Sequence, residues 1–103
     1  VRAVPDAASA LASADGVVNA TPIGMLKYPG MPFAPELLLA RQWVAEIIYF
    51  PRETELLRRA AALGCRTLPG TGMAVCQAVR AFELFTGIQA DRAAMAGHFE
   101  AAA

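Results

Sequence analysis

Three short apolar runs alternate with segments of helical character up to residue 68, and this alternation constrains the fold most strongly. The runs at 17–20, 43–49 and 65–68 are bounded by turn residues, as buried strands are. Strands that alternate with helices over short connections pair in parallel through right-handed crossovers. The sequence therefore predicts an α/β sheet, with the first strand buried on both faces and the second ending at Tyr49.

Four segments have helical composition and carry recognisable capping residues. Thr54 and Asp91 are expected to cap the starts of two helices, because their side-chain oxygens can accept from free backbone N–H groups. Gly64 and Gly87 follow two helical segments and are expected to end them. The apolar face of one helix consists of Leu56, Leu57, Ala60 and Leu63. The helices are expected over residues 5–14, 54–63, 72–85 and 91–102.

The segment 21–35 contains four prolines and two glycines, too many helix and strand breakers for regular structure. We expect a long loop there, followed by a short helical turn at 36–40. Long ordered loops that follow strands often carry functional residues. This loop is therefore a candidate part of a binding site.

A doubly wound sheet binds its ligands just beyond the carboxyl ends of its strands. In this chain those positions are 19–25, 49–51 and 69–73, and all three contain Gly or Pro beside polar groups. The sequence therefore predicts one shared crevice at this edge of the sheet.

Each candidate in this crevice also has a purely structural interpretation. Ala20 and Gly24 are small enough to let a flat ligand approach the backbone, and Thr21 offers a hydroxyl, but the same residues suit a tight turn locked by Pro22. Tyr49 is expected to pack its ring in the core, either extending its hydroxyl into the crevice or satisfying it locally.

The glycine pair in 70–73 precedes a helix but does not match the spacing of a dinucleotide-binding motif. Met73 and Gln77 stand four residues apart, on the same helix face. Burying an amide without a partner costs about 1–3 kcal/mol, so Gln77 either faces solvent or binds a defined group.

The charge balance and hydropathy argue against several classes of partner. Nine basic residues match nine acidic ones, and the basic residues form no stripe, so we expect no nucleic-acid partner. No apolar run approaches the roughly 20 residues of a membrane helix, so we expect a soluble protein with no membrane partner. A reducing cytoplasmic location is expected from the interpretation of the two cysteines as buried free thiols.

No metal site is expected from the cysteines and the histidine. Cys65 and Cys76 form no CxxC pair and have no His nearby in sequence, so we interpret both as small buried hydrophobic residues in a reducing compartment. His98 is interpreted as a surface or packing residue rather than a catalyst.

Taken together, "VVNATPIGM" at 17–25, "VAEIIYFPRETELLRRAAALGCRT" at 44–67 and "GTGMAVCQAVRAFELFTG" at 70–87 resemble the carboxyl-terminal part of the shikimate dehydrogenase family. The likeness runs from about residue 15 to about residue 91 and is close to the quinate/shikimate dehydrogenase branch. It implies the second half of a Rossmann-like, doubly wound parallel sheet with two closing carboxyl-terminal helices. Residues 1–70 would belong to a partial NAD(P)-binding domain, and residues 71–103 would return toward a substrate domain that this chain lacks.

The resemblance also implies specific roles for residues of this chain. The activity would be hydride transfer between NAD or NADP and a cyclic polyol acid, as in shikimate or quinate oxidation. The substrate would be held by Tyr49 and Gln77. The cofactor would be held by Ala20, Thr21, Ile47, Gly70 and Met73.

Some family features have no match in this chain. The catalytic lysine and aspartate lie in the family's amino-terminal domain, and Lys27 is not expected to replace the lysine. We therefore expect the chain to be part of a longer enzyme, to be inactive alone, and to need a partner surface for its last two helices. The resemblance is also compatible with a homodimer.

Three residues depart from the family's usual pattern. Pro69 and Glu46 stand where aspartate is common, and Phe50 stands where the shikimate-specific branch has asparagine. Pro69 and Phe50 motivate an alternative hypothesis, a non-catalytic ligand-binding or regulatory module that retains the fold.

Overall fold

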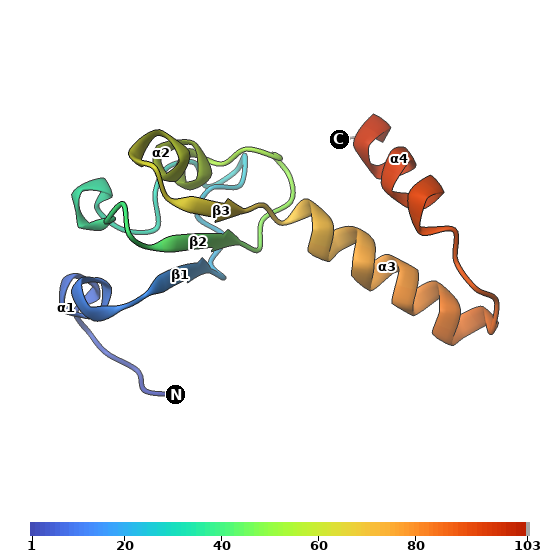
Figure 1. The fold of residues 1–103 in the computed structure, drawn as a ribbon, viewed down its shortest axis with the longest axis horizontal. Helices are drawn as coiled ribbons and strands as arrows, with labels where there is room; N and C mark the ends of the chain where they lie inside the picture. Colours follow the sequence, from blue (N-terminus) through green and yellow to red (C-terminus); the bar gives the residue numbers. More distant parts are fainter. Residues whose placement is uncertain (103) are drawn as a thin grey trace.

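Three parallel strands form a sheet of order β1-β2-β3 in the structure, a computed structural model that describes residues 1–102 (Figure 1). The strands are β1 (Gly16–Asn19), β2 (Trp43–Glu46) and β3 (Arg66–Leu68). Val44 lies at the centre of the sheet, in register with Val17 on one side and Thr67 on the other. The predicted α/β class with parallel strands is confirmed.

The second strand is shorter than the sequence predicts, because it ends at Glu46 and not at Tyr49. Its neighbours end too early to pair with residues 47–49, since Asn19 is in register with Glu46 and Leu68 with Ala45. One backbone hydrogen bond continues the pairing of β1 with β2 beyond Glu46, from the Ile47 N–H to the Asn19 carbonyl oxygen at 3.1 Å. The segment 47–50 is therefore free to leave the plane of the sheet.

The predicted helices are present, with ends shifted by one or two residues. Thr54 Oγ1 accepts from the Leu57 N–H at 3.3 Å, and Asp91 Oδ1 accepts from the Ala94 N–H at 2.9 Å, as expected of N-caps. Gly64 and Gly87 end two helices in the left-handed backbone region. The helices are α1 (Ala7–Ser13), η1 (Pro35–Leu37), α2 (Glu55–Leu63), α3 (Thr71–Thr86) and α4 (Arg92–Ala102), with η1 in place of the turn expected at 36–40.

One face of the sheet packs against α2 and the long loop and forms the core. Leu63 was expected on the buried face of α2, but it is largely exposed because it is the last residue of that helix and no described element covers it. The buried members of this core are Leu38, Val44, Leu56, Leu57, Ala60 and Cys65, with Val17, Met31 and Phe33 packed against them.

The opposite face of the sheet is left uncovered by the described chain. Val18 is 53% exposed and Leu68 is 67% exposed, and both lie in register with Ala45. The expectation that the first strand is buried on both faces is therefore wrong for the described residues. Trp43 lies on this face and covers Gly16, where an added Cβ would stand 2.0 Å from the indole ring.

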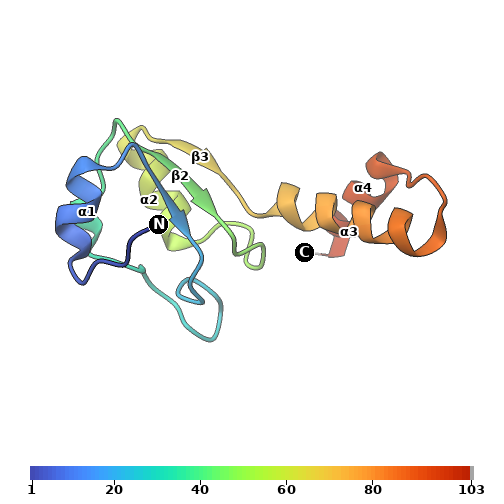
Figure 2. The same cartoon turned by 90° about the horizontal axis from the view of Figure 1, so that it is seen from below.

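The last two helices project from the end of β3, and α4 folds back beside α3 (Figures 1 and 2). Within α3 only Ala74 and Val79 are buried, and no described residue of α4 is. Cys76 is exposed, contrary to expectation, because its side of α3 meets no core; Cys65 is buried as predicted. The two helices are thus not fully packed within the described chain.

Within residues 1–102, no helix has both the length and the hydropathy that a membrane crossing requires.

Candidate functional site

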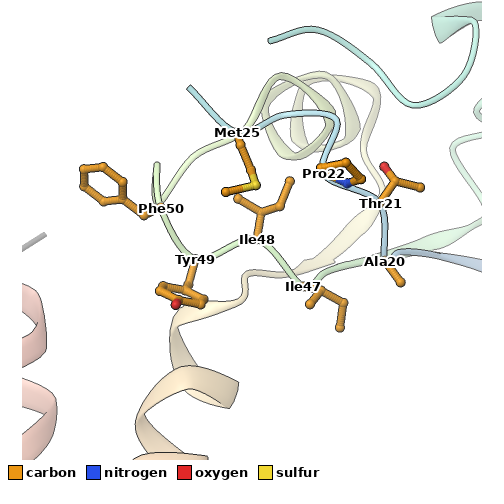
Figure 3. Close-up of a pocket in the computed structure, with 8 residues that line it drawn as sticks. All are labelled: Ala20, Thr21, Pro22, Met25, Ile47, Ile48, Tyr49 and Phe50. Carbon is orange, nitrogen blue, oxygen red and sulfur yellow. The ribbon is translucent and has the colours of Figure 1, made fainter. Parts of the chain in front are cut away.

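Two loops at the carboxyl edge of the sheet enclose a cavity of about 620 Å³, within the usual range of ligand sites (Figure 3). One loop follows β1 and the other follows β2. Met25 and Ile48 point toward each other between the loops, whereas Ala20, Ile47 and Tyr49 point together to the side on which α3 begins. The cavity is lined by Ala20, Thr21, Pro22, Met25, Ile47, Ile48, Tyr49 and Phe50.

The start of α3 lies directly against the second of these loops. An added Cβ at Gly70 would stand 2.5 Å from the Ile48 carbonyl oxygen and 2.8 Å from that of Ile47. These distances are far shorter than van der Waals contact, so only glycine permits this approach of the two backbones. Gly70 therefore sets how closely α3 approaches the cavity.

The structure brings together most, but not all, of the residues that the sequence proposes for this site. Ala20, Thr21, Ile47 and Tyr49 line the cavity. Gly70 adjoins it through the Ile47 and Ile48 backbone. The other two, Met73 and Gln77, are exposed along α3 and are not among the lining residues.

Tyr49 is held by α4 rather than by the core. Its ring lies 5.9 Å from the Phe99 ring, between centroids, with the planes inclined by 59°. Tyr49 is 43% exposed, so the expectation that its ring packs in the core is wrong. The reason is that β2 ends at Glu46, which carries residue 49 past the sheet to the side chains of α4.

A buried polar network joins the elements that build the cavity. Glu46 is 3% exposed and accepts from three groups. Its Oε2 accepts from Asn19 Nδ2 at 3.1 Å and from Thr54 Oγ1 at 2.9 Å, and its Oε1 accepts from the Ile48 N–H at 3.2 Å. Buried polar groups need such partners, and among the described residues no buried side-chain nitrogen or oxygen lacks one.

Asn19 fixes the loop that follows β1. Its Oδ1 accepts from the Thr21 N–H at 3.1 Å and from Thr21 Oγ1 at 2.7 Å, as in an Asx turn. Its Nδ2 also donates to the Ile23 carbonyl oxygen at 3.0 Å. Asn19 thus holds the Thr21 side of the cavity while it binds Glu46.

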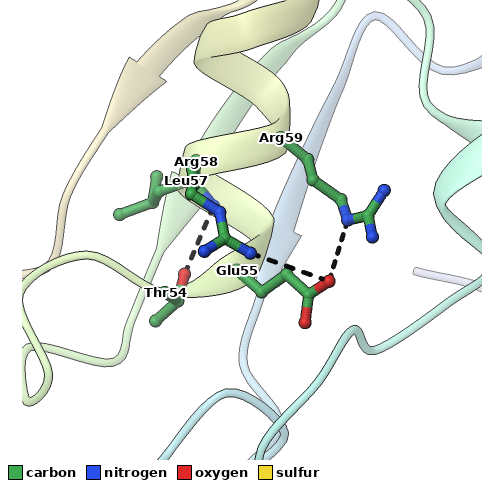
Figure 4. Close-up of polar contacts among 5 residues, drawn as sticks. All are labelled: Thr54, Glu55, Leu57, Arg58 and Arg59. Carbon is green, nitrogen blue, oxygen red and sulfur yellow. Dashed lines mark hydrogen bonds and ion pairs between the residues drawn. The ribbon is translucent and has the colours of Figure 1, made fainter.

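Thr54 belongs to the network and also caps the start of α2, and Figure 4 shows its contact with Leu57. Its hydroxyl donates to Glu46 and accepts from the Leu57 N–H. In the first turn of the same helix, Glu55 Oε1 lies 2.9 Å from Arg59 Nε and 3.9 Å from Arg58 Nη2. These ion pairs are exposed and contribute little to stability, so the cap and the network fix this end of α2.

Sequence reasoning did not identify the network. The available signal was a carboxylate inside the apolar run "WVAEIIY", which a buried strand tolerates only when the charge has partners. Asn19 and Glu46 are 27 residues apart, so neither residue's local pattern reveals the other.

The remaining reactive side chains lie apart from the cavity. Burial raises the pKa of the Cys65 thiol above its ordinary value. Lys27 and His98 are exposed, on the long loop and on α4. Among residues 1–102 there is no group of three or more His, Cys, Asp or Glu side chains arranged to hold a metal ion.

Sequence comparison relates the chain to a known enzyme family. Residues 70–97 match the family model described as the shikimate 5'-dehydrogenase C-terminal domain. Over 82 residues the chain is 58% identical to the quinate/shikimate dehydrogenase (NAD(+)) of Corynebacterium efficiens, and over 81 residues it is 62% identical to the shikimate dehydrogenase (NADP(+)) of Streptomyces avermitilis. These matches cover 80% and 79% of this chain.

Solved structures show the same fold. Quinate dehydrogenase from Corynebacterium glutamicum in complex with NAD matches 91% of this chain, with a TM-score of 0.86 and 51% identity. Shikimate 5-dehydrogenase from Thermus thermophilus in complex with NADP(H) and shikimate matches 100% of it, with a TM-score of 0.85 and 33% identity. The matched regions make up 33% and 39% of those two chains.

The matches cover only part of the curated relatives. The chain spans 29% of the length of the Corynebacterium efficiens protein and 28% of the Streptomyces avermitilis protein. The resemblance to the family's carboxyl-terminal part and the Rossmann-like fold class are confirmed by these comparisons.

Proposed function

From this similarity to the carboxyl-terminal part of shikimate dehydrogenases, we propose that the chain belongs to an NAD- or NADP-dependent shikimate or quinate/shikimate dehydrogenase. The complete enzyme interconverts a ketone and a secondary alcohol on a cyclic polyol acid. The observation that carries this proposal is the identity of 58% to a quinate/shikimate dehydrogenase over 82 residues, which is 80% of this chain.

The cavity suits the nicotinamide end of a dinucleotide. Ala20 is small and Ile47 presents an exposed apolar side chain, so a flat ring can lie against this side of the loops. The absence of a side chain at Gly70 brings α3, which carries Met73, close to the same place. When bound, the nicotinamide supplies or accepts the hydride. Ala20, Thr21, Ile47, Gly70 and Met73 would hold and orient it.

The polyol acid would bind beside this ring through Tyr49 and Gln77. Tyr49 lines the cavity and is steadied by Phe99, which favours a fixed position for its hydroxyl. Gln77 is exposed on α3, one helical turn beyond Met73, and its amide can bind a hydroxyl or a carboxylate. These contacts would fix the reacting carbon near the cofactor, and orientation of this kind is a large part of catalysis. The proton would be handled by residues outside this chain.

The remainder of the enzyme is the partner that this proposal requires. We assign residues 1–70 to a partial NAD(P)-binding domain and residues 71–103 to helices that return toward the substrate domain. The uncovered sheet face and the exposed apolar side chains of α3, such as Phe85 at 88% exposure, support such a partner. A homodimer and a reducing cytoplasmic location fit the same proposal, and Cys65 and Cys76 are both free thiols.

The test is a cofactor assay on the full-length protein. Reduced-cofactor absorbance should rise when quinate or shikimate is mixed with NAD or NADP. Heat-inactivated protein is the control. No rate with either acid and either cofactor would contradict the enzymatic proposal.

An alternative is a non-catalytic ligand-binding or regulatory module. Phe50 favours it, because this half-exposed ring forms part of the cavity wall where the shikimate-specific branch has a polar asparagine. Pro69 is the second residue that departs from the family's usual pattern, and it directly precedes Gly70 at the start of α3. The preceding sequence distinguishes the two hypotheses: a catalytic Lys and Asp with a glycine-rich turn favour the enzyme, and their absence favours the module.

A further inference from the structure

One carboxylate, that of Glu46, joins the two loops that face each other across the cavity. Through Asn19 it is connected to Thr21 on the first loop, and through the Ile48 N–H it is connected to the second loop. Through Thr54 it is connected to the start of α2. Glu46 itself is not among the residues that line the cavity.

This buried group links the two cavity walls at the point where the sheet ends. β1 and β2 end at Asn19 and Glu46, so beyond them the loops have only the single Ile47 to Asn19 backbone bond as a direct continuation of the sheet. Ala20 and Ile47, which point to the same side of the cavity, follow the two network residues immediately. A change in the network would move both residues relative to each other.

We propose that Glu46 is a positioning residue for the nicotinamide cofactor, acting through Asn19 and the backbone of Ile48. This inference rests on the proposed function. It assigns the dinucleotide affinity of the complete enzyme in part to a residue that does not touch the ligand. The spacing between the Thr21 and Ile47 sides of the cavity is the quantity that Glu46 controls.

The network requires two acceptor oxygens, which only a carboxylate provides. Three donors converge on Glu46: Asn19 Nδ2, Thr54 Oγ1 and the Ile48 N–H. In Glu46→Gln, one oxygen becomes an NH₂ group, so at least one donor must face another donor in a buried place. Glu46→Asp keeps the charge and both acceptors and shortens the side chain by one methylene.

The experiment is calorimetric titration of the full-length protein with NADH and NADPH, without substrate. Glu46→Gln should weaken binding of the preferred dinucleotide roughly tenfold or more, because the ligand must then restore the spacing of the two loops when it binds. Glu46→Asp should stay within about threefold of the parent protein, because its acceptors remain. Equal affinity of the parent protein and Glu46→Gln would overturn the positioning role.

A general loss of stability is separated from positioning by a core control. Val44→Ala removes two methyl groups from a buried residue of the same strand and leaves a small void in the core. Val44 is not among the residues that line the cavity. The substitution should lower the midpoint of thermal unfolding and leave dinucleotide affinity unchanged. If Val44→Ala weakens binding as much as Glu46→Gln does, the effect is structural and the proposal fails.

A second pair of variants tests the network if Glu46→Gln does not fold. Thr54→Val removes the hydroxyl that donates to Glu46, whereas Thr54→Ser keeps it. We expect weaker dinucleotide binding for Thr54→Val only, because the lost donor holds the same Glu46 oxygen that accepts from Asn19 and so frees the carboxylate to shift. Equal affinities would contradict the proposal. A parent protein that binds neither NADH nor NADPH would instead contradict the proposed function itself.

Discussion

Tyr49 and Phe99 pack their rings together at a centroid distance of 5.9 Å, which ties the last helix to the cavity at the carboxyl edge of the sheet. A second contact supports the same junction, since the Arg52 guanidinium donates to the Glu100 carbonyl oxygen. The residue that we propose for substrate binding is thus positioned by a helix that follows it by some forty residues. The orientation of its hydroxyl depends on how α4 docks.

Removal of the Tyr49 hydroxyl should weaken substrate binding without weakening the fold. Tyr49→Phe keeps the ring and its contact with Phe99, so thermal unfolding should be unchanged. When one partner of a hydrogen bond to the substrate is removed, the binding free energy falls by about 1–3 kcal/mol. KM for quinate or shikimate should therefore rise roughly tenfold or more. Steady-state kinetics of the full-length enzyme measure this change.

Phe99→Ala is the matched variant for the ring contact. It leaves the hydroxyl of Tyr49 in place but removes a packing interaction of about 0.5–1.5 kcal/mol. We expect a lower unfolding midpoint and a modest rise in KM. An unchanged KM in Tyr49→Phe would show that the hydroxyl does not bind substrate.

Local signals were sufficient to predict the secondary structure and the parallel sheet. The caps at Thr54 and Asp91 and the terminating Gly64 are determined by neighbouring residues, and all three lie where the sequence places them. The end of β2 was not predictable in this way, because it depends on where β1 and β3 stop. The uncovered sheet face was missed for the same reason, since burial depends on segments distant in sequence.

The site was predictable only in part. The rule that ligands bind beyond the carboxyl ends of strands located the loops, and Thr21 and Tyr49 line one cavity. The Glu46 network was missed because it needs the pairing of β1 with β2 before its members meet. The contact of Gly70 with the Ile48 carbonyl likewise requires the three-dimensional path of the chain.

The two cysteines should differ in reactivity. Cys76 is exposed on α3, whereas Cys65 is buried and its pKa is raised by desolvation, which lowers its thiolate fraction. Iodoacetamide at neutral pH should therefore alkylate Cys76 well before Cys65, as followed by peptide mass spectrometry. Denatured protein, in which both react, is the control. Equal rates in the native protein would contradict this prediction.

The buried thiol also predicts a loss of stability at alkaline pH. The pKa of Cys65 is raised above its ordinary value of 9.0 in the folded state, so folding favours the neutral thiol. Its contribution is complete below that value and is lost as the pH rises toward the folded pKa. Urea unfolding should show a steeper decline above pH 9.0 for the parent protein than for Cys65→Ala. Parallel declines would contradict this.

Gly16→Ala should destabilise the sheet by displacing the Trp43 indole. The new methyl group would stand 2.0 Å from the ring, so either the ring or the strand must move. Overpacking of this kind costs about 1–3 kcal/mol, measurable by urea unfolding. A free energy of unfolding within about 0.5 kcal/mol of the parent value would show that the ring rotates away at little cost.

Gly70→Ala should impair the site by pushing α3 away from the loop that follows β2. The backbone of Gly70 is in the ordinary right-handed region, so the substitution introduces no backbone strain, and its effect is the clash with the Ile47 and Ile48 carbonyl oxygens. We expect cofactor affinity to fall roughly tenfold or more, which corresponds to about 1.4 kcal/mol of binding free energy. Titration of the full-length enzyme measures this change. Gly72→Ala is the matched control, because an added Cβ there meets nothing within 4 Å and alanine favours the helix. If both variants bind NAD(P)H as the parent protein does, the close approach of α3 does not determine affinity.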